Sequence, residues 1–168
     1  NLIVKAYRML SADHILPHIN FNLEKHIPSQ AGLGGGSSDA TYTLRLLNKL
    51  CQLNLNSATL HQYAVRLGAD CAFFVTATPA FATGIGDILE PMNAECAHLH
   101  GMYLLIVKPT VAISTAQAFA FVKPEPTLIK CKDIVAQPVN SEWRNHLTNN
   151  FEVSAFKLHP EMHTIKEQ

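Results

Sequence analysis

Apolar residues in the first part of the chain recur every three or four positions in three stretches, which predicts three amphipathic helices. The first begins at Asn1 as its N-cap and ends before a connection at residues 11–17, and the second follows the serines at positions 37 and 38. The third begins at Ser57 as its N-cap, and Gly68 suits a left-handed C-cap. The expected buried faces carry Ile3, Tyr7 and Leu10; Ala40, Leu44, Leu47 and Cys51; and Leu60, Ala64 and Leu67.

Alternating or continuous apolar runs predict the strands. In residues 18–25 apolar and polar side chains alternate, which indicates a strand with one buried face. Continuous apolar runs predict a short strand at residues 71–75 and another strand at residues 102–109. Two short strands are also predicted within residues 81–91, around a turn at 84–86. The polar stretch between the last two suggests a domain boundary, so we expect domains over residues 1–98 and 99–168. Beyond Thr115 the pattern weakens, prolines at 124, 126 and 138 interrupt it, and residues 141–147 are expected to open a helix.

Composition narrows the class of protein. The 168 residues are 48% apolar, enough for one medium or two small cores. Formal net charge is zero at pH 7, which points away from nucleic acid and from an anionic membrane surface, and no apolar run could span a bilayer. The four cysteines are widely spaced, so we expect Cys51 and Cys71 to be buried and the protein to be cytoplasmic. The nine histidines lack the spacing of a zinc site.

Four of the eight glycines lie in the stretch Pro28–Ala40, which reads PSQAGLGGGSSDA and leads into the second helix. Small residues at a helix start expose backbone N–H groups at the positive end of the helix dipole, where phosphates bind. No Lys-Ser/Thr pair follows the glycines, and Ser37 stands where a dinucleotide fingerprint has its third glycine. A phosphate site here would therefore use backbone amides and the serine hydroxyls. The alternative is a flexible loop with a Ser or Asp helix cap.

Asp70 stands between Ala69 and Cys71, after the third helix and before an apolar run. A carboxylate among apolar residues is costly unless it is paired or used. It could orient a substrate hydroxyl and accept its proton, or it could be a turn aspartate that bonds its own backbone.

The glycine loop, LGAD at residues 67–70 and TGIGD at residues 83–87 occur together in this chain. Together they resemble the GHMP superfamily of small-molecule kinases, whose phosphate loop has a P-x(3)-G-L-x-S-S-A pattern. NLIVKAYRML, GLGGGSSDA, LGADCAFF and ATGIGDIL are similar, in order and spacing, to members that phosphorylate diphosphocytidyl methylerythritol. The resemblance is strong from Asn1 to about Thr115 and then fades.

The resemblance implies a role for each matching position. The loop residues Gly32, Gly34, Gly35, Gly36, Ser37 and Ser38 would wrap the triphosphate of ATP, and Ser38 would also reach Mg²⁺. Positions around the adenine are matched by Asn1, Leu2 and Lys25. Asp70 matches the catalytic aspartate. The substrate would lie along Gly68 and Ala69, with its cytidine near Thr115 and the ring of Phe119.

The resemblance also implies a fold and a reaction. We expect an α+β protein with an N-terminal half like domain 2 of ribosomal protein S5 and an incomplete ferredoxin-like C-terminal half. Its reaction would be ATP-dependent phosphorylation of diphosphocytidyl methylerythritol in non-mevalonate isoprenoid biosynthesis, by a monomer or homodimer. The alternatives are another GHMP kinase acting on mevalonate, homoserine or a sugar, and a non-catalytic nucleotide-binding relative.

The chain departs from the family pattern at both ends. It lacks the early Lys-Leu-Asn strand, whose lysine pairs with the catalytic aspartate, the Gly-Tyr-His segment that helps hold cytosine, and the later Thr-Gly-x-Gly-like motif. About three fifths of the pattern is covered. Because nothing else in the sequence supports Asp70, we expect this chain to be a weak or inactive catalyst.

Overall fold

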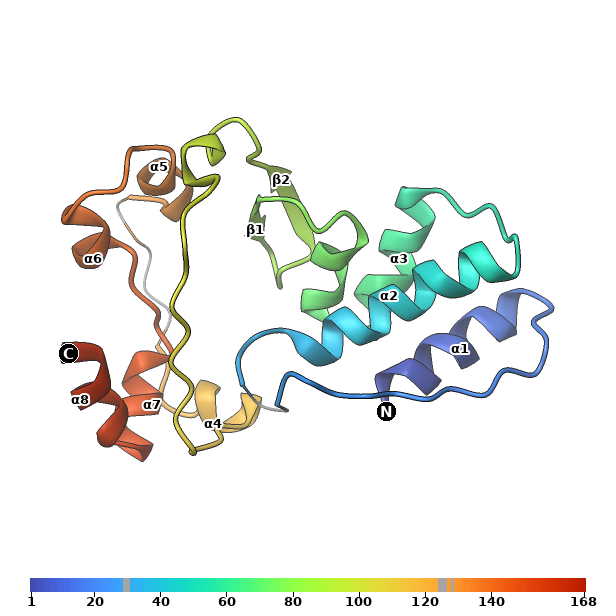
Figure 1. Ribbon diagram of the computed structural model, residues 1–168, viewed down its shortest axis with the longest axis horizontal. Coiled ribbons are helices and arrows are strands. Elements are labelled where there is room, and N and C mark those ends of the chain that lie inside the picture. Colours follow the sequence, from blue (N-terminus) through green and yellow to red (C-terminus); the bar gives the residue numbers. More distant parts are fainter. Residues whose placement is uncertain (29–30, 124–126, 128) are drawn as a thin grey trace. The chain divides into compact units, whose positions relative to one another are not determined.

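The computed structural model describes residues 1–28, 31–123, 127 and 129–168. The chain divides into two compact units, Asn1–Asn93 and Ala94–Gln168 (Figure 1). Two residues of the glycine-rich stretch, Ser29 and Gln30, and two of the expected proline breaks, at positions 124 and 126, lie outside the described residues. No helix in the described part of the chain is both long enough and apolar enough to span a bilayer.

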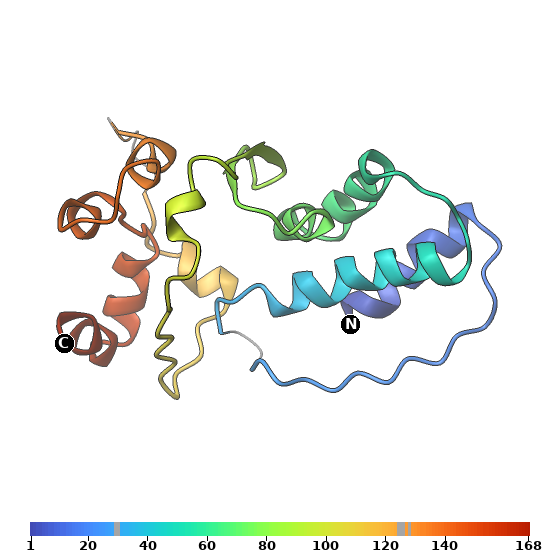
Figure 2. The ribbon, with the colours of Figure 1, turned by 45° about the horizontal axis from the view of Figure 1, so that its top comes forward.

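The first unit is built from helices and one hairpin. Its described elements are α1 (Leu2–Asp13), α2 (Gly35–Leu50), α3 (Ser57–Leu67), the 3-10 helix η1 (Ala69–Val75), β1 (Ala80–Thr83) and β2 (Ile88–Pro91). Helices α1 and α2 lie side by side (Figures 1 and 2). Helices together with an antiparallel hairpin agree with the predicted α+β class.

The core of this unit lies where α1, α2, α3 and η1 meet. Its buried side chains include Leu10, Ala40, Leu44, Leu47, Leu60, Ala64, Leu67 and Cys71. Each buried leucine contributes about 1.5–3 kcal/mol relative to an exposed one. The helical faces expected from the sequence are thus confirmed, except that Tyr7 and Cys51 are only half-buried.

Details of the helix ends differ from expectation. Asn1 caps α1 as predicted, with Oδ1 accepting from the Ile3 amide at 3.0 Å, but the helix continues to Asp13. The N-cap of α3 is Asn56 rather than Ser57, because the Asn56 side chain accepts from the Thr59 amide at 2.9 Å. Gly68 does end α3, with an extended backbone (φ 174°) rather than a left-handed one.

The other three predicted strands are wrong, whereas the hairpin is confirmed. Residues 18–25 run extended but pair with no strand among the described residues, and residues 71–75 belong to η1. Residues 102–109 form no strand either, and Leu104 and Leu105 are 84% and 88% exposed. In the hairpin, β1 pairs antiparallel with β2, with Phe81 opposite Glu90. An alternating or apolar run becomes a strand only when a neighbouring strand satisfies its backbone.

The second unit contains short helices in its described residues. These are the 3-10 helix η2 (Ala97–Leu99), α4 (Thr115–Phe119), α5 (Cys131–Val135), α6 (Glu142–His146), α7 (Glu152–Leu158) and α8 (Glu161–Glu167). Helix α6 confirms the helix expected at residues 141–147. Buried side chains are few here, among them Ile134 and Ser154, whose Oγ accepts from the Phe121 amide at 3.3 Å. The expected ferredoxin-like arrangement stays a prediction.

Candidate active site

The glycine stretch reaches α2 through residues in the left-handed backbone region. Gly32 has φ 71° and Gly34, the N-cap of α2, has φ 65°. Gly34 also lies against η1, because a Cβ added to it would stand 3.0 Å from Cζ of Phe74. Both the backbone conformation and the close approach therefore require glycine at position 34.

The N-terminus of α2 has no side-chain cap. Asparagine side chains cap α1 and α3, but Gly34 offers no side chain to α2. The first backbone bond of the helix runs from the Ser38 amide to the Gly34 carbonyl at 2.8 Å. The amides of Gly35, Gly36 and Ser37 precede that bond, so they have no partner within the helix. Their N–H groups and the helix dipole make this end suited to an anion.

Two hydroxyls of α2 connect it to η1. Thr41 Oγ1 donates to the Cys71 carbonyl oxygen at 2.8 Å in the core. Burial raises the pKa of the Cys71 thiol, and hydrogen bonding by the Ser37 and Thr41 hydroxyls opposes that rise only in part. Ser37 is thus held against η1, whereas the half-buried Ser38 hydroxyl makes no hydrogen bond within the described residues.

Asp70 lies in the first turn of η1 with its side chain exposed. The turn of the hairpin comes close to it: a Cβ added to Gly86 would stand 3.8 Å from Asp70 Oδ1 and 3.8 Å from the Ala69 carbonyl oxygen. Asp70 forms no ion pair within the described part of the chain. The carboxylate is therefore accessible, and the bond between Thr41 and Cys71 fixes its helix to the end of α2.

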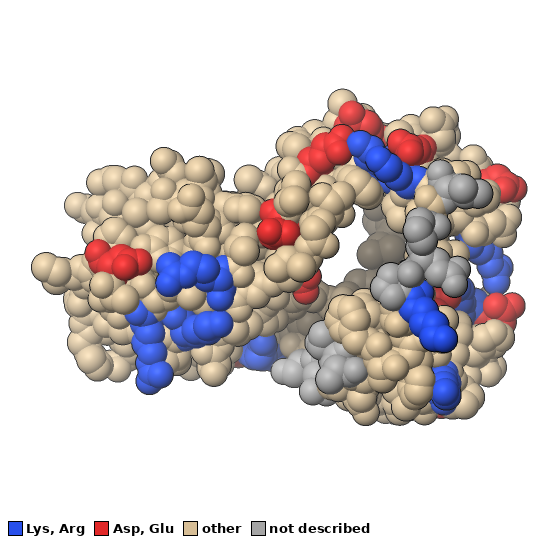
Figure 3. Space-filling view, turned by 180° about the vertical axis from the view of Figure 1, so that it is seen from behind, with Lys and Arg blue, Asp and Glu red and all other residues tan. Residues whose placement is uncertain are grey.

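The start of α1 lies beside the glycine loop. A Cβ added to Gly36 would stand 3.8 Å from Leu2 Cδ1. Asn1 and Leu2 also line a pocket of about 580 Å³ together with Val4, Lys5 and Arg8. Lysine and arginine side chains gather on the face of the first unit seen in Figure 3. A pocket with cationic side chains beside the uncapped end of α2 suits a nucleotide.

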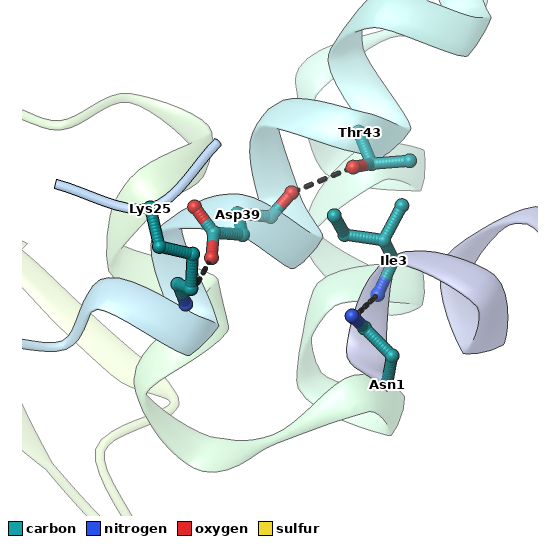
Figure 4. Close-up of polar contacts among 5 residues, drawn as sticks. All are labelled: Asn1, Ile3, Lys25, Asp39 and Thr43. Carbon is teal, nitrogen blue, oxygen red and sulfur yellow. Dashed lines mark hydrogen bonds and ion pairs between the residues drawn. The ribbon is translucent and has the colours of Figure 1, made fainter. Parts of the chain in front are cut away.

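Lys25 lies on the other side of the loop. Its Nζ atom forms an ion pair with Asp39 Oδ2 at 2.6 Å, from the extended segment to the second turn of α2 (Figure 4). The backbone carbonyl of Asp39 accepts from Thr43 Oγ1 at 2.7 Å. The ammonium group of Lys25 is therefore already engaged by a carboxylate.

The expected substrate positions fall in both units. Gly68 closes α3, and its carbonyl accepts from the Cys71 amide at 3.1 Å; Ala69 opens η1. In the second unit Thr115 is the first residue of α4 and Phe119 the last. The Phe119 ring is 60% exposed and meets the ring of Phe151 edge to face at 4.9 Å.

Sequence reasoning missed the residues that connect the motifs. Asp39 follows the serines directly and Thr41 stands two positions later, yet nothing in their spacing shows which residues they contact. Gly86, the second glycine of the TGIGD turn, can be identified in the sequence. Its closeness to Asp70 is a tertiary contact that the sequence does not show. No group of three or more His, Cys, Asp or Glu side chains within the described ranges is placed to hold a metal ion. An ion here would need ligand oxygens from elsewhere, and the free Ser38 hydroxyl fits as one protein ligand.

Known proteins similar to this chain are small-molecule kinases. Residues 1–78 match the family model of the GHMP kinases N terminal domain. A protein of Bacteroides thetaiotaomicron named 4-diphosphocytidyl-2-C-methyl-D-erythritol kinase is 48% identical over all 168 residues, which make up 60% of its length. Residues 1–78 of this chain thus resemble the N-terminal domain of the GHMP kinases. A Parabacteroides distasonis protein of the same name is 42% identical over 99% of the chain and 60% of its own length.

A solved structure shows the same family fold. It is the crystal structure of a 4-(cytidine 5'-diphospho)-2C-methyl-D-erythritol kinase, with a TM-score of 0.67 and 28% sequence identity. The match covers 98% of this chain and 59% of that one. The chain thus has the GHMP kinase fold and spans about three fifths of the length of the relatives it matches.

Proposed function

We propose that this protein is an ATP-dependent kinase that phosphorylates a hydroxyl group of 4-diphosphocytidyl-2-C-methyl-D-erythritol, the compound in its relatives' names. The observation that carries the proposal is the contact between two motifs. The uncapped end of α2, which suits a triphosphate, is packed through Gly34 against η1, which carries an accessible Asp70. An anion site and a proton acceptor on adjoining elements are the parts that phosphoryl transfer needs.

The triphosphate would lie at the end of α2. The amides of Gly35, Gly36 and Ser37 would donate to its oxygens, and left-handed Gly32 and Gly34 would shape the loop around it. Asn1, Leu2 and Lys25 would border the adenosine, in line with the pocket at the start of α1. Fixed donors of this kind stabilise negative charge on a transferring phosphoryl group without reorganising.

Asp70 would orient the substrate hydroxyl and accept its proton. The hydroxyl oxygen then forms a bond to the γ-phosphorus while the bond from that phosphorus to the bridging oxygen breaks, so ADP leaves with the electron pair. An exposed carboxylate without an ion-pair partner in the described residues can take up this proton. Mg²⁺, with Ser38 as its protein ligand, would neutralise phosphate charge when bound.

The remaining assignments follow the family pattern. Gly68 and Ala69 would lie along the substrate, and Thr115 and Phe119 near its cytidine, with the exposed Phe119 ring available for stacking. Residues 1–98 would form the S5-like ATP-binding domain, and 99–168 part of a ferredoxin-like domain. Cytoplasmic location and a monomeric or homodimeric state remain predictions of the sequence.

Binding and turnover assays with Asp70→Asn test the proposal. We expect the 168-residue chain to bind Mg·ATP and cytidine diphosphate, and to phosphorylate the named substrate weakly. Asp70→Asn should retain Mg·ATP binding and lose about 10²-fold or more of the turnover. The matched control is Asp133→Asn, an exposed carboxylate of the second unit.

Each outcome separates a different alternative. Turnover unchanged in Asp70→Asn would contradict the catalytic role of that carboxylate. Binding of Mg·ATP without any binding of cytidine diphosphate would favour another substrate of the same kinase family. Failure to bind Mg·ATP at all would contradict the kinase assignment of this site.

A further inference from the structure

The ion pair between Lys25 and Asp39 joins the two ends of the glycine loop. Lys25 precedes the loop, Asp39 follows it in α2, and the pair is 14 positions apart in sequence. Their side chains are 35% and 28% exposed, so water screens the pair only in part. A contact that closes a loop limits the conformations open to all the residues between its ends.

The segment that leads into the loop is held by Leu16 and Ile19, which pack against the core, and by contacts at its two ends. At its start Tyr7 Oη donates to the Pro17 carbonyl at 2.8 Å, and the Tyr7 and Phe21 rings meet edge to face at 5.8 Å. At its end Ile27 lies against Gly35, where an added Cβ would stand 3.7 Å from Ile27 Cγ2. Residues 18–25 pair with no strand among the described residues, and the ion pair is a polar contact that fixes their end nearest the loop.

We propose that Asp39 is a positioning residue, which acts through Lys25 to hold the glycine loop in the shape that binds the triphosphate. The inference rests on the proposed function, since it gives the nucleotide site a supporting contact. The Lys25 ammonium could have one of two roles: it could bind phosphate directly, or it could hold the loop through its ion pair with Asp39. If it acted directly on phosphate, Asp39 would compete for it and add unfavourable negative charge near the nucleotide. If it acts through Asp39, both residues are needed.

The two roles predict opposite effects of Asp39→Asn. Removing the carboxylate would strengthen Mg·ATP binding if it frees Lys25 for phosphate. It should weaken binding about two- to fivefold if the pair shapes the loop, the range expected for a partly exposed ion pair. Lys25→Gln should weaken binding at least as much, because it leaves Asp39 unpaired beside the nucleotide.

The experiment combines hydrogen–deuterium exchange with Mg·ATP titration of the 168-residue chain. Asp39→Asn should raise amide exchange in residues 20–28 and 31–36 in the absence of nucleotide, and lower the affinity for Mg·ATP. The charge-swapped variant Lys25→Asp/Asp39→Lys should restore the slow exchange, whereas its affinity for Mg·ATP also carries the loss of Lys25 beside the adenosine. Glu24→Gln is the matched control, because its side chain is 84% exposed and the variant removes one acidic charge beside Lys25.

Three results would overturn the inference: unchanged exchange in Asp39→Asn, tighter nucleotide binding in that variant, or unchanged affinity despite faster exchange. Failure of the proposed function looks different, because the unsubstituted chain would then bind no Mg·ATP. In that case the exchange measurement alone decides whether Asp39 holds the loop, and unchanged exchange would refute it.

Discussion

The Thr41 hydroxyl donates a hydrogen bond to the carbonyl oxygen of Cys71 at 2.8 Å, and both residues are fully buried. This bond connects the helix that follows the glycine loop with the short helix that carries Asp70. The two motifs lie far apart in sequence, and the bond sets their separation. Thr41 is therefore a structural residue on which the candidate site depends.

Thr41→Val should destabilise the first unit by about 1–3 kcal/mol, because it removes the hydroxyl that donates to a buried carbonyl oxygen. Urea unfolding followed by circular dichroism measures the change. Thr41→Ser keeps the hydroxyl and should retain most of the bond, apart from the small cost of a lost methyl group. Equal losses in the two variants would show that packing, rather than the hydrogen bond, holds these helices together.

Gly34→Ala should destabilise more than Gly32→Ala. Both glycines have left-handed backbones, so each substitution costs about 1–2 kcal/mol in conformation. Only at Gly34 would the new Cβ also stand 3.0 Å from the Phe74 ring, whereas nothing lies within 4 Å of one at Gly32. Thermal unfolding of the two variants makes the comparison. Adding Phe74→Leu should recover part of the loss in Gly34→Ala, and no recovery would contradict the contact.

The stability of the first unit should decrease at alkaline pH because of Tyr63. Its hydroxyl donates to Asp13 Oδ2 at 2.6 Å, and this bond, with burial and the carboxylate charge, raises the pKa of Tyr63 above 10.0. The folded state therefore keeps the phenol proton longer than the unfolded state does. The stability from this group is fully present below pH 10 and is lost as pH rises through the raised pKa.

Tyr63→Phe should cost about 1 kcal/mol at neutral pH and make unfolding less sensitive to pH above 10. Denaturant unfolding at a series of pH values measures both effects. Tyr42→Phe is the matched control, because it removes the same hydroxyl from a side chain that is 47% exposed. The same pH profile in Tyr63→Phe and in the unsubstituted chain would refute the linkage.

The helices of the first unit could be predicted from the sequence because their apolar faces and caps are local signals. The apolar run at residues 71–75 was misread, since a short buried run fits a strand or a helix equally well. Residues 18–25 show the opposite case: the alternation of a strand is present, but pairing depends on a neighbour that no local pattern reveals. The sequence could not distinguish Asn56 from Ser57 as the N-cap of α3, because two good capping residues stand side by side. The structure shows that Asn56 is the cap.

The candidate site was predictable in its motifs and not in its supports. Glycines before a helix indicate an anion site, and an acidic residue among apolar ones indicates a functional carboxylate. Both signals are local in the sequence. The contacts of Asp39 with Lys25, of Thr41 with Cys71 and of Gly86 with Asp70 join residues 14 or more positions apart. Such contacts arise only when the core brings helices together, so a single sequence cannot show them.

Amide chemical shifts of the chain, followed by NMR during titration with Mg·ATP, test the central claim most directly. The claim is that the end of α2 binds the triphosphate next to Asp70. The amides of Gly34, Gly35, Gly36, Ser37 and Ser38 should show the largest saturable shifts, with a smaller change at Asp70. Saturable binding that leaves these amides unmoved, or no binding at all, would contradict it.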